Sequence, residues 1–89
     1  NLRIMGEIAL ARGDVARAEE YLQSSYTILS EADDEYECGR TQLALAELYL
    51  LQRKYQDGLK FLAQCSAIFE RLQASLDLAT AQSLRARYP

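Results

Sequence analysis

The sequence contains no histidine and no tryptophan, and only one proline, among its 89 residues. Without histidine, the side chain most often used as a general base or a metal ligand near neutral pH is absent. The four glycines stand apart from one another, so no glycine-rich loop for phosphate is present. No apolar run approaches the roughly 20 residues that span a membrane. We therefore expect no enzyme activity, no metal, no cofactor and no membrane segment.

Cysteine is also scarce, with only Cys38 and Cys65 in the chain. Their spacing fits neither a metal site nor the dense cysteine pattern of a small secreted domain. Each falls within a predicted helix, where we expect it to be a small buried hydrophobic residue. Neither has a neighbour in the sequence that would activate a thiolate. This usage favours a reducing, cytoplasmic location.

The charge balance is mildly acidic, with 10 Lys and Arg against 13 Asp and Glu. The basic residues are scattered, whereas a nucleic-acid-binding surface requires a basic face, so we expect no direct binding of nucleic acid. Hydrophobic residues make up 49% of the chain, too many for a disordered tail. The opening residues NLRIMGE lack the features of a signal peptide and an initiator methionine, which predicts a fragment of a longer protein.

Apolar residues recur at helical spacing along most of the chain, which predicts five helices. On the first of them, Leu2, Met5, Ile8 and Ala9 share one face. Gly13 stops this helix and Asp14 caps the next one. Four of the predicted helices cover about 2–12, 35–52, 55–72 and 76–87. The other one, second along the chain, begins after Asp14 and includes Val15 through Leu29.

Four carboxylates fall within five positions, at Asp33, Asp34, Glu35 and Glu37. A calcium loop requires alternating acidic ligands, a central glycine and a late glutamate, and this spacing is not present. We interpret Asp34 as the N-cap of the following helix and Glu37 as its partner in a capping box. All four charges then lie near the positive end of that helix.

The chain contains two copies of a helical hairpin, shifted by about 40 residues, a period typical of solenoids. Large residues align with large ones and small with small, as interlocking helices require. The aligned pairs are Met5 with Leu45, Gly6 with Ala46, Ala9 with Tyr49, Ala18 with Gly58, Leu22 with Leu62, Ser25 with Cys65 and Ile28 with Ile68.

This pattern resembles the tetratricopeptide repeat (TPR). In that family the first helix carries a large residue, a Leu-Gly type pair and an aromatic residue, and the second helix carries small, large and small residues. The matching positions here are Leu2, Met5, Gly6, Ala9, Ala18, Leu22 and Ser25 in the first unit, and Gln42, Leu45, Ala46, Tyr49, Gly58, Leu62 and Cys65 in the second.

The chain departs from the family in two respects. The closing proline is missing, with Ser30 and Glu70 in its places, and the period exceeds the usual ~34 residues. The longer period is similar to a variant found in bacterial multidomain signalling proteins. These include LuxR-type regulators with a signal-transduction ATPase and the helical tails of some kinases and cyclases. Residues 34–48 and 68–82 look particularly like that group.

The resemblance implies an all-α fold, a right-handed α-α superhelix built as a solenoid of helical hairpins. We expect a single domain over residues 1–89. Its first repeat covers about 1–32 and its second about 35–72. A capping helix over about 75–87 closes the stack, because its second half is polar.

In TPR proteins the first helices of successive repeats line a concave groove that holds a segment of a partner. By position, the resemblance implies a groove lined by Arg3, Glu7, Leu10, Leu43, Glu47, Leu50 and Leu51. Stacking places Glu7 beside Glu47, so we hypothesise a preference for partners with a basic residue amid apolar ones. The alternative is that these side chains are solvated or contact a neighbouring repeat.

The function we expect is a protein–protein interaction scaffold within a larger cytoplasmic signalling or regulatory protein. Two alternatives stay open. One is a sensor that binds a small molecule or signalling peptide and controls an attached ATPase or transcriptional output domain. The other is a structural oligomerisation module. Because Leu2, Ile4, Ile8 and Ala11 would leave apolar surface uncovered, we also expect that the isolated chain self-associates or else needs repeats that precede it.

Overall fold

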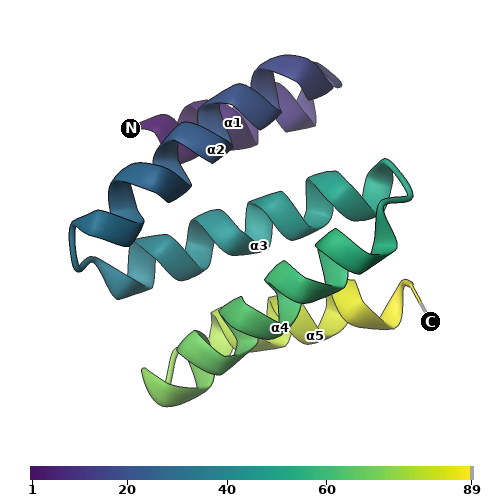
Figure 1. Ribbon diagram of the computed structural model, residues 1–89. Helices are drawn as coiled ribbons and strands as arrows, with labels where there is room; N and C mark the ends of the chain where they lie inside the picture. The colour runs from purple at the N-terminus through teal and green to yellow at the C-terminus, as the bar shows by residue number, and fades with distance from the viewer. Residues whose placement is uncertain (89) are drawn as a thin grey trace.

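The computed structural model describes residues 1–88, which form five helices and no strand (Figure 1). The all-α fold class is confirmed. For the four helices whose bounds were predicted, each predicted boundary lies within one residue of the observed one. Pro89, the last residue of the predicted domain, lies outside the described residues. The helices are α1 (Leu2–Ala11), α2 (Val15–Glu31), α3 (Glu35–Leu51), α4 (Tyr55–Arg71) and α5 (Ser75–Ala86).

The four connections between helices are one turn repeated. Each contains a residue with positive φ, and these residues recur every 20 positions, at Gly13 (80°), Asp33 (57°), Arg53 (63°) and Gln73 (57°). In three of the turns the next backbone N–H reaches back five residues to a helix carbonyl, as from Asp14 to the carbonyl of Ala9, which is the bond that closes a Schellman motif. The 40-residue repeat is therefore built from two equal 20-residue steps.

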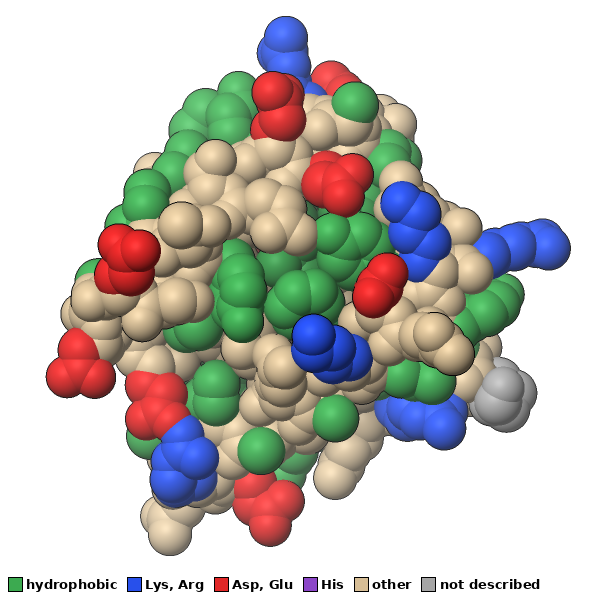
Figure 2. Space-filling view, in the orientation of Figure 1, with side chains coloured by type: hydrophobic (Ala, Val, Ile, Leu, Met, Phe, Trp, Pro, Cys, Tyr) green, Lys and Arg blue, Asp and Glu red, His purple; other side chains and the backbone are tan. Residues whose placement is uncertain are grey.

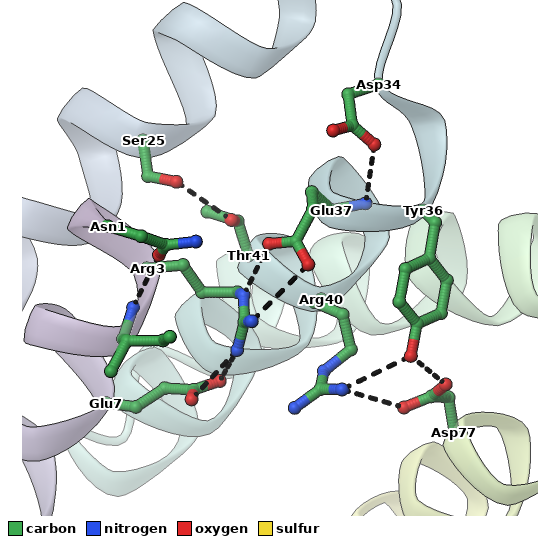
Figure 3. Close-up of polar contacts among 11 residues, drawn as sticks. Asn1, Arg3, Glu7, Ser25, Asp34, Tyr36, Glu37, Arg40, Thr41 and Asp77 are labelled. Carbon is green, nitrogen blue, oxygen red and sulfur yellow. Dashed lines mark hydrogen bonds and ion pairs between the residues drawn. The ribbon is translucent and has the colours of Figure 1, made fainter.

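Side-chain caps occur at the first three helices only. Asn1, Asp14 and Asp34 each accept a hydrogen bond from the backbone N–H three residues later, as predicted for Asp34. Lys54 and Ala74 occupy the N-cap positions of α4 and α5 and make no such bond. The second half of the predicted capping box is wrong, because the Glu37 carboxylate binds Arg3 on α1 (Figure 3).

Each hairpin has a glycine where a leucine of the facing helix approaches closely. A Cβ on Gly6 of α1 would lie 2.6 Å from Cγ of Leu22 on α2. A Cβ on Gly58 of α4 would lie 2.7 Å from Cγ of Leu50 on α3. The aligned positions in the other hairpin, Ala46 and Ala18, are both buried alanines. Small residues at these positions let a leucine of the facing helix fill the contact.

Helix α3 lies in the middle of the stack, with α1 and α2 on one side and α4 and α5 on the other (Figure 1). It contributes to both hydrophobic clusters of the core. Its Leu45 and Leu48 pack with Leu22, while its Ala46 and Leu50 pack with Phe69. Burial of α3 on nearly every side therefore joins the two hairpins into one core.

Polar and aromatic contacts fix how the hairpins fit together. The buried hydroxyls of Ser25 and Thr41 are 3.0 Å apart, which joins α2 to α3. The Tyr49 hydroxyl accepts a hydrogen bond from Gln23 at 2.7 Å and donates one to Glu19 at 3.1 Å. The ring of Tyr26 on α2 packs edge-on against that of Phe61 on α4, with centroids 5.4 Å apart. These directional contacts specify one orientation of the hairpins.

One prediction about burial is confirmed and one needs correction. Ile4 and Ile8 are exposed, as expected for the uncovered end of the stack, and Met5 is exposed with them; the buried residues of α1 are Arg3, Gly6 and Ala9. The apolar stripe containing Met5 and Ile8 has no described helix against it. Of the two cysteines, Cys65 is fully buried as expected, whereas Cys38 in the first turns of α3 is only half-buried.

Candidate partner-binding groove

The first helix of each hairpin and α5 together line a groove along one side of the stack. Its volume is about 370 Å³. The lining residues are Glu7, Leu10 and Ala11 of α1, Arg40, Leu43, Ala44, Glu47 and Leu51 of α3, and Asp77, Thr80, Leu84 and Arg87 at α5 and its C-cap. Helix α5 contributes to the groove as α1 and α3 do, because it follows the same 20-residue spacing of turns as the helices before it.

Five of the seven residues predicted for the groove line it, namely Glu7, Leu10, Leu43, Glu47 and Leu51. Leu50 does not, because it is only 1% exposed and packs against Gly58. A helix turns by about 100° per residue, so Leu50 faces α4 while the neighbouring Leu51 is exposed at the groove. Leu50 is therefore a core residue and its predicted place in the groove is wrong.

Arg3 is also absent from the groove wall, because it is buried between two carboxylates (Figure 3). Its guanidinium donates to Glu7 at 3.0 Å and to Glu37 of α3 at 2.8 Å. Burial acts to lower the pKa of Arg3, but the hydrogen bonds and charges of Glu37 and Glu7 raise it overall. The hydrogen bond from Arg3 likewise lowers the pKa of Glu37. Arg3 thus joins α1 to α3 and neutralises Glu7.

A second arginine–carboxylate contact joins α3 to α5 (Figure 3). Arg40 lies 3.6 Å from Asp77, and the Tyr36 hydroxyl donates to the same carboxylate at 2.7 Å. Arg40 also donates to the Tyr36 hydroxyl at 3.2 Å. Asp77 lies 40 residues after Glu37, and both stand in the first turn of their helices. The same position therefore accepts an arginine from the preceding hairpin at both junctions.

These pairs leave two charges in the groove without an ion pair among residues 1–88, Glu47 and Arg87. Both occupy the position of Glu7, one and two periods later along the chain. The predicted acidic pair of Glu7 and Glu47 is thus reduced to Glu47, because Arg3 neutralises Glu7. The groove presents one acidic and one basic side chain on a partly apolar wall.

The residues that α5 contributes to the groove were not predicted, because a capping helix is expected to close the stack without lining the groove. Asp77, Thr80, Leu84 and Arg87 all line the groove. The 40-residue shift could have found Arg87, which aligns with Glu47. It could not have found the pairing of Arg40 with Asp77, because that contact depends on side-chain conformations across the junction.

Metal ligands and thiols were also sought among the described residues. Within residues 1–88, no group of three or more His, Cys, Asp or Glu side chains could hold a metal ion. Burial raises the pKa of Cys65 to about 11 and also raises the pKa of Cys38, so both thiols are poor nucleophiles at neutral pH. In the same range, none of the helices has the length and apolar character to cross a membrane.

Basic side chains do not gather on the face of the molecule shown in Figure 2. Lys and Arg are separated there by acidic, polar and apolar side chains. A surface that follows a nucleic-acid backbone requires neighbouring positive charges. Neighbouring positive charges of that kind are not seen on this face.

Comparison with known proteins identifies one similarity. The family model described as the tetratricopeptide repeat matches residues 1–71, about four fifths of the chain. The match covers both hairpins and ends at the last residue of α4. No curated protein and no solved structure matches the chain.

Proposed function

Because the chain belongs to the tetratricopeptide repeat family, we propose that its groove binds a segment of a partner protein. Repeats of this family generally mediate protein–protein interaction. In this proposal the chain is a scaffold with no catalytic role of its own. The raised pKa values of both thiols support that role, since neither cysteine is activated as a nucleophile.

The observation that carries the proposal is the wall of the groove itself. Leu10, Leu43 and Leu51 come from two different hairpins and line the same cavity. Leu51 is an exposed large hydrophobic residue and would lose water contact beneath a bound segment. A fully buried leucine side chain contributes about 1.5–3 kcal/mol relative to an exposed one. These leucines therefore provide the apolar part of a binding site.

The charges of the groove select the partner. Glu47 favours a basic residue, and Arg87 at the aligned position beside α5 favours an acidic one. The proposed partner segment thus has apolar residues, a basic residue opposite Glu47 and an acidic residue opposite Arg87. The acidic residue is an addition to the preference predicted from the sequence.

The test is a peptide array in which apolar peptides carry a basic residue, an acidic residue, both or neither. We expect peptides with both charges to be enriched, and Glu47→Arg to weaken the selected peptides about tenfold. The matched control is Glu20→Arg, which makes the same charge change on an exposed position of α2 outside the groove. An array without enrichment, or equal effects of the two variants, would refute the proposal.

We further propose that the chain is part of a larger cytoplasmic protein of the bacterial signalling type. The 40-residue spacing of the turns supports the longer-period variant of the repeat, as does the likeness of residues 34–48 and 68–82 to that group. The full coding sequence tests this directly. An adjoining ATPase, kinase, cyclase or DNA-binding module is expected, and a coding sequence without any of them would contradict the assignment.

A further inference from the structure

A second cavity lies between α4 and α5, which pack side by side at the end of the described stack (Figure 1). Its volume is about 340 Å³, and it shares no lining residue with the groove. Leu59, Leu62 and Ala63 of α4 make its wall largely apolar. Ser66 of α4 and Arg85 of α5 add polar groups. The cavity is therefore a separate surface, with both an apolar and a charged part.

The same position one repeat earlier is filled by a side chain. Three residues of the cavity have counterparts 40 positions earlier, at the junction of α2 and α3: Leu62 aligns with Leu22, Ser66 with Tyr26 and Arg85 with Leu45. Phe61 of α4 packs against the core cluster that contains Leu22 and Leu45. Its ring meets that of Tyr26 edge-on, with centroids 5.4 Å apart. In this fold, such a junction thus receives an aromatic side chain from a third helix.

Helix α4 crosses that earlier junction in a defined register. Gln64, three residues after Phe61, accepts a hydrogen bond from Gln42 of α3 at 3.2 Å. Gln82 of α5 aligns with Gln42 and lines the cavity. Asp57 stands four residues before Phe61, so both lie on the same face of α4. The contacts of α4 thus give a template for a helix that would lie on α4 and α5.

Two differences between the junctions change what such a helix must carry. Ser66 takes the place of Tyr26, which leaves room for a ring larger than that of Phe61. Arg85 takes the place of the fully buried Leu45, and it makes no ion pair among residues 1–88. The second junction therefore favours a large aromatic residue together with an acidic one.

The position of the Arg85 guanidinium indicates where the acidic residue belongs. It donates to the carbonyl of Tyr88 at 2.8 Å and so points toward the C-terminal end of α5. Helix α4 runs antiparallel to α3 (Figure 1), and a helix placed likewise on α5 would have its earlier residues at that end. An acidic residue one turn before the aromatic one would therefore lie beside Arg85.

We propose that this cavity binds an amphipathic helix of a partner protein, with a large aromatic residue and an acidic residue four positions before it. The ring fills the apolar part between α4 and α5, and the carboxylate pairs with Arg85. A second copy of this chain does not supply such a helix. Phe61 is the only aromatic residue of the sequence that follows an acidic one by four positions, and it is already packed between the hairpins.

The probe is the helix that fills the earlier junction, as a capped synthetic peptide of residues 55–71 with Phe61→Trp. The chain has no tryptophan, so the fluorescence reports on the peptide alone. With the full 89-residue chain, we expect saturable binding in the range of about 10–100 μM and a blue shift of the tryptophan emission. The unchanged peptide should compete about threefold more weakly, and a peptide with Phe61→Ala more than about tenfold more weakly.

A charge exchange locates the site. Arg85→Glu in the chain should weaken binding of the probe about tenfold, and Asp57→Lys in the probe should restore most of that loss. The matched control is Arg12→Glu, which changes an exposed arginine at the C-cap of α1 that also lacks an ion pair among residues 1–88. Circular dichroism confirms that each variant is folded.

Four outcomes would overturn the inference. The first is a probe that shows no blue shift with up to about 1 mM of the chain. The second is equal weakening by Arg85→Glu and Arg12→Glu, the result expected if the probe only replaces the chain's own α4. The third is a chain that dimerises by itself and loses the dimer in Arg85→Glu, which would make a second copy the occupant.

The fourth is loss of probe binding when the chain is extended by any residues that its coding sequence places after Pro89, which would assign the cavity to that extension. Peptide binding in the groove depends on Glu47 and not on Arg85, which does not line it. The proposed function and this inference therefore fail separately.

Discussion

Helices α1 and α3 hold the same place in their hairpins but have opposite surroundings. Met5 of α1 is 43% exposed, while the aligned Leu45 of α3 is completely buried. Ile8 of α1 is 46% exposed, while the aligned Leu48 is also completely buried. The apolar pattern is nearly the same in both helices. The difference arises because α2 covers this face of α3, and no described helix covers that of α1.

The burial of an apolar side chain in a stack of repeats depends on the neighbouring repeat as much as on the helix that carries it. An apolar residue at the interface position becomes core only when another hairpin lies against it. The same reasoning applies to α5, where Leu76 is exposed but the aligned Tyr36 contacts Phe69. Both ends of the described stack therefore present interface residues to solvent.

The largest expected effect comes from truncating aligned residues of the two helices. Leu45→Ala should lower the free energy of unfolding by about 2–5 kcal/mol, because it removes a fully buried side chain and leaves a cavity. Met5→Ala should cost less than about 1 kcal/mol, since that side chain is already partly solvated. Urea unfolding followed by circular dichroism measures both.

A milder pair keeps this test informative if Leu45→Ala does not fold. Leu45→Met preserves volume and should cost less than about 1.5 kcal/mol, still more than the nearly neutral reverse change Met5→Leu. Equal costs at the two positions would show that α1 is covered as fully as α3 in solution. That result would remove the contrast between the helices.

A smaller effect is expected where the glycines let the helices approach. Gly58→Ala should destabilise by up to about 2 kcal/mol, because its new Cβ overlaps the side chain of Leu50 and this cost exceeds the gain in helix propensity. The same change at Gly6, which meets Leu22, should have a similar effect. Thermal unfolding of both variants compares the two hairpins at their closest contacts.

A double-mutant cycle provides the control. In a Leu50→Ala background the side-chain overlap disappears and only the 3.2 Å approach to the backbone nitrogen of residue 50 remains, so Gly58→Ala should lose most of its cost, with helix propensity offsetting the rest by up to about 1 kcal/mol. If Gly58→Ala has the same effect in both backgrounds, the contact with Leu50 is not what requires glycine at this position.

Much of this contrast could be predicted from the sequence, and some of it could not. Aligning the hairpins placed Gly58 and Ala18 at equivalent small positions and gave the helix boundaries, because apolar spacing and turn residues encode both. The uncovered end formed by Ile4 and Ile8 was predicted, but the exposure of Met5 beside them was not, since periodicity does not show where on a helix the covered face ends. Leu50 was assigned to the groove by its position in the repeat, but its side chain is buried in the core.

The polar half of the groove was the hardest part to predict. Glu37 was assigned to a capping box because its spacing from Asp34 fits one, yet its carboxylate binds Arg3 of the preceding hairpin. Local spacing cannot show that a buried arginine 34 residues away competes for the same carboxylate. The same arginine also pairs with Glu7, so the charge of the groove depended on where Arg3 lies as well.

The junction between α1 and α3 should be sensitive to acid. Glu37→Gln is expected to lower the free energy of unfolding at pH 7 by about 1–2 kcal/mol, because Arg3 loses a charged hydrogen-bond partner. The pKa of Glu37 is lowered in the folded chain, so its contribution is present above its ordinary pKa of 4.5 and is lost as pH falls through the lower folded value. The difference between variant and parent should shrink below pH 4.5.

The matched control is Glu31→Gln, which removes an exposed carboxylate at the end of α2. Its effect should stay within about 0.5 kcal/mol at pH 7. A Glu37→Gln variant that loses nothing at pH 7, or whose deficit is the same at pH 3, would show that the contact with Arg3 does not stabilise the junction of the two hairpins.

The smallest effect is one of reactivity and leaves stability unchanged. Cys65 packs against Ala46 and Leu50 of α3, and burial raises its pKa to about 11, whereas Cys38 is half-buried at the start of α3. A thiol reagent at pH 8 should therefore label Cys38 first, and Cys65 only when α4 separates from α3 or the chain unfolds. Cys38→Ser should remove the fast phase and leave the slow one. Fast labelling of Cys65 would mean that the surroundings of α3 open readily, and the contrast between the buried α3 and the exposed α1 would then hold only for the closed state.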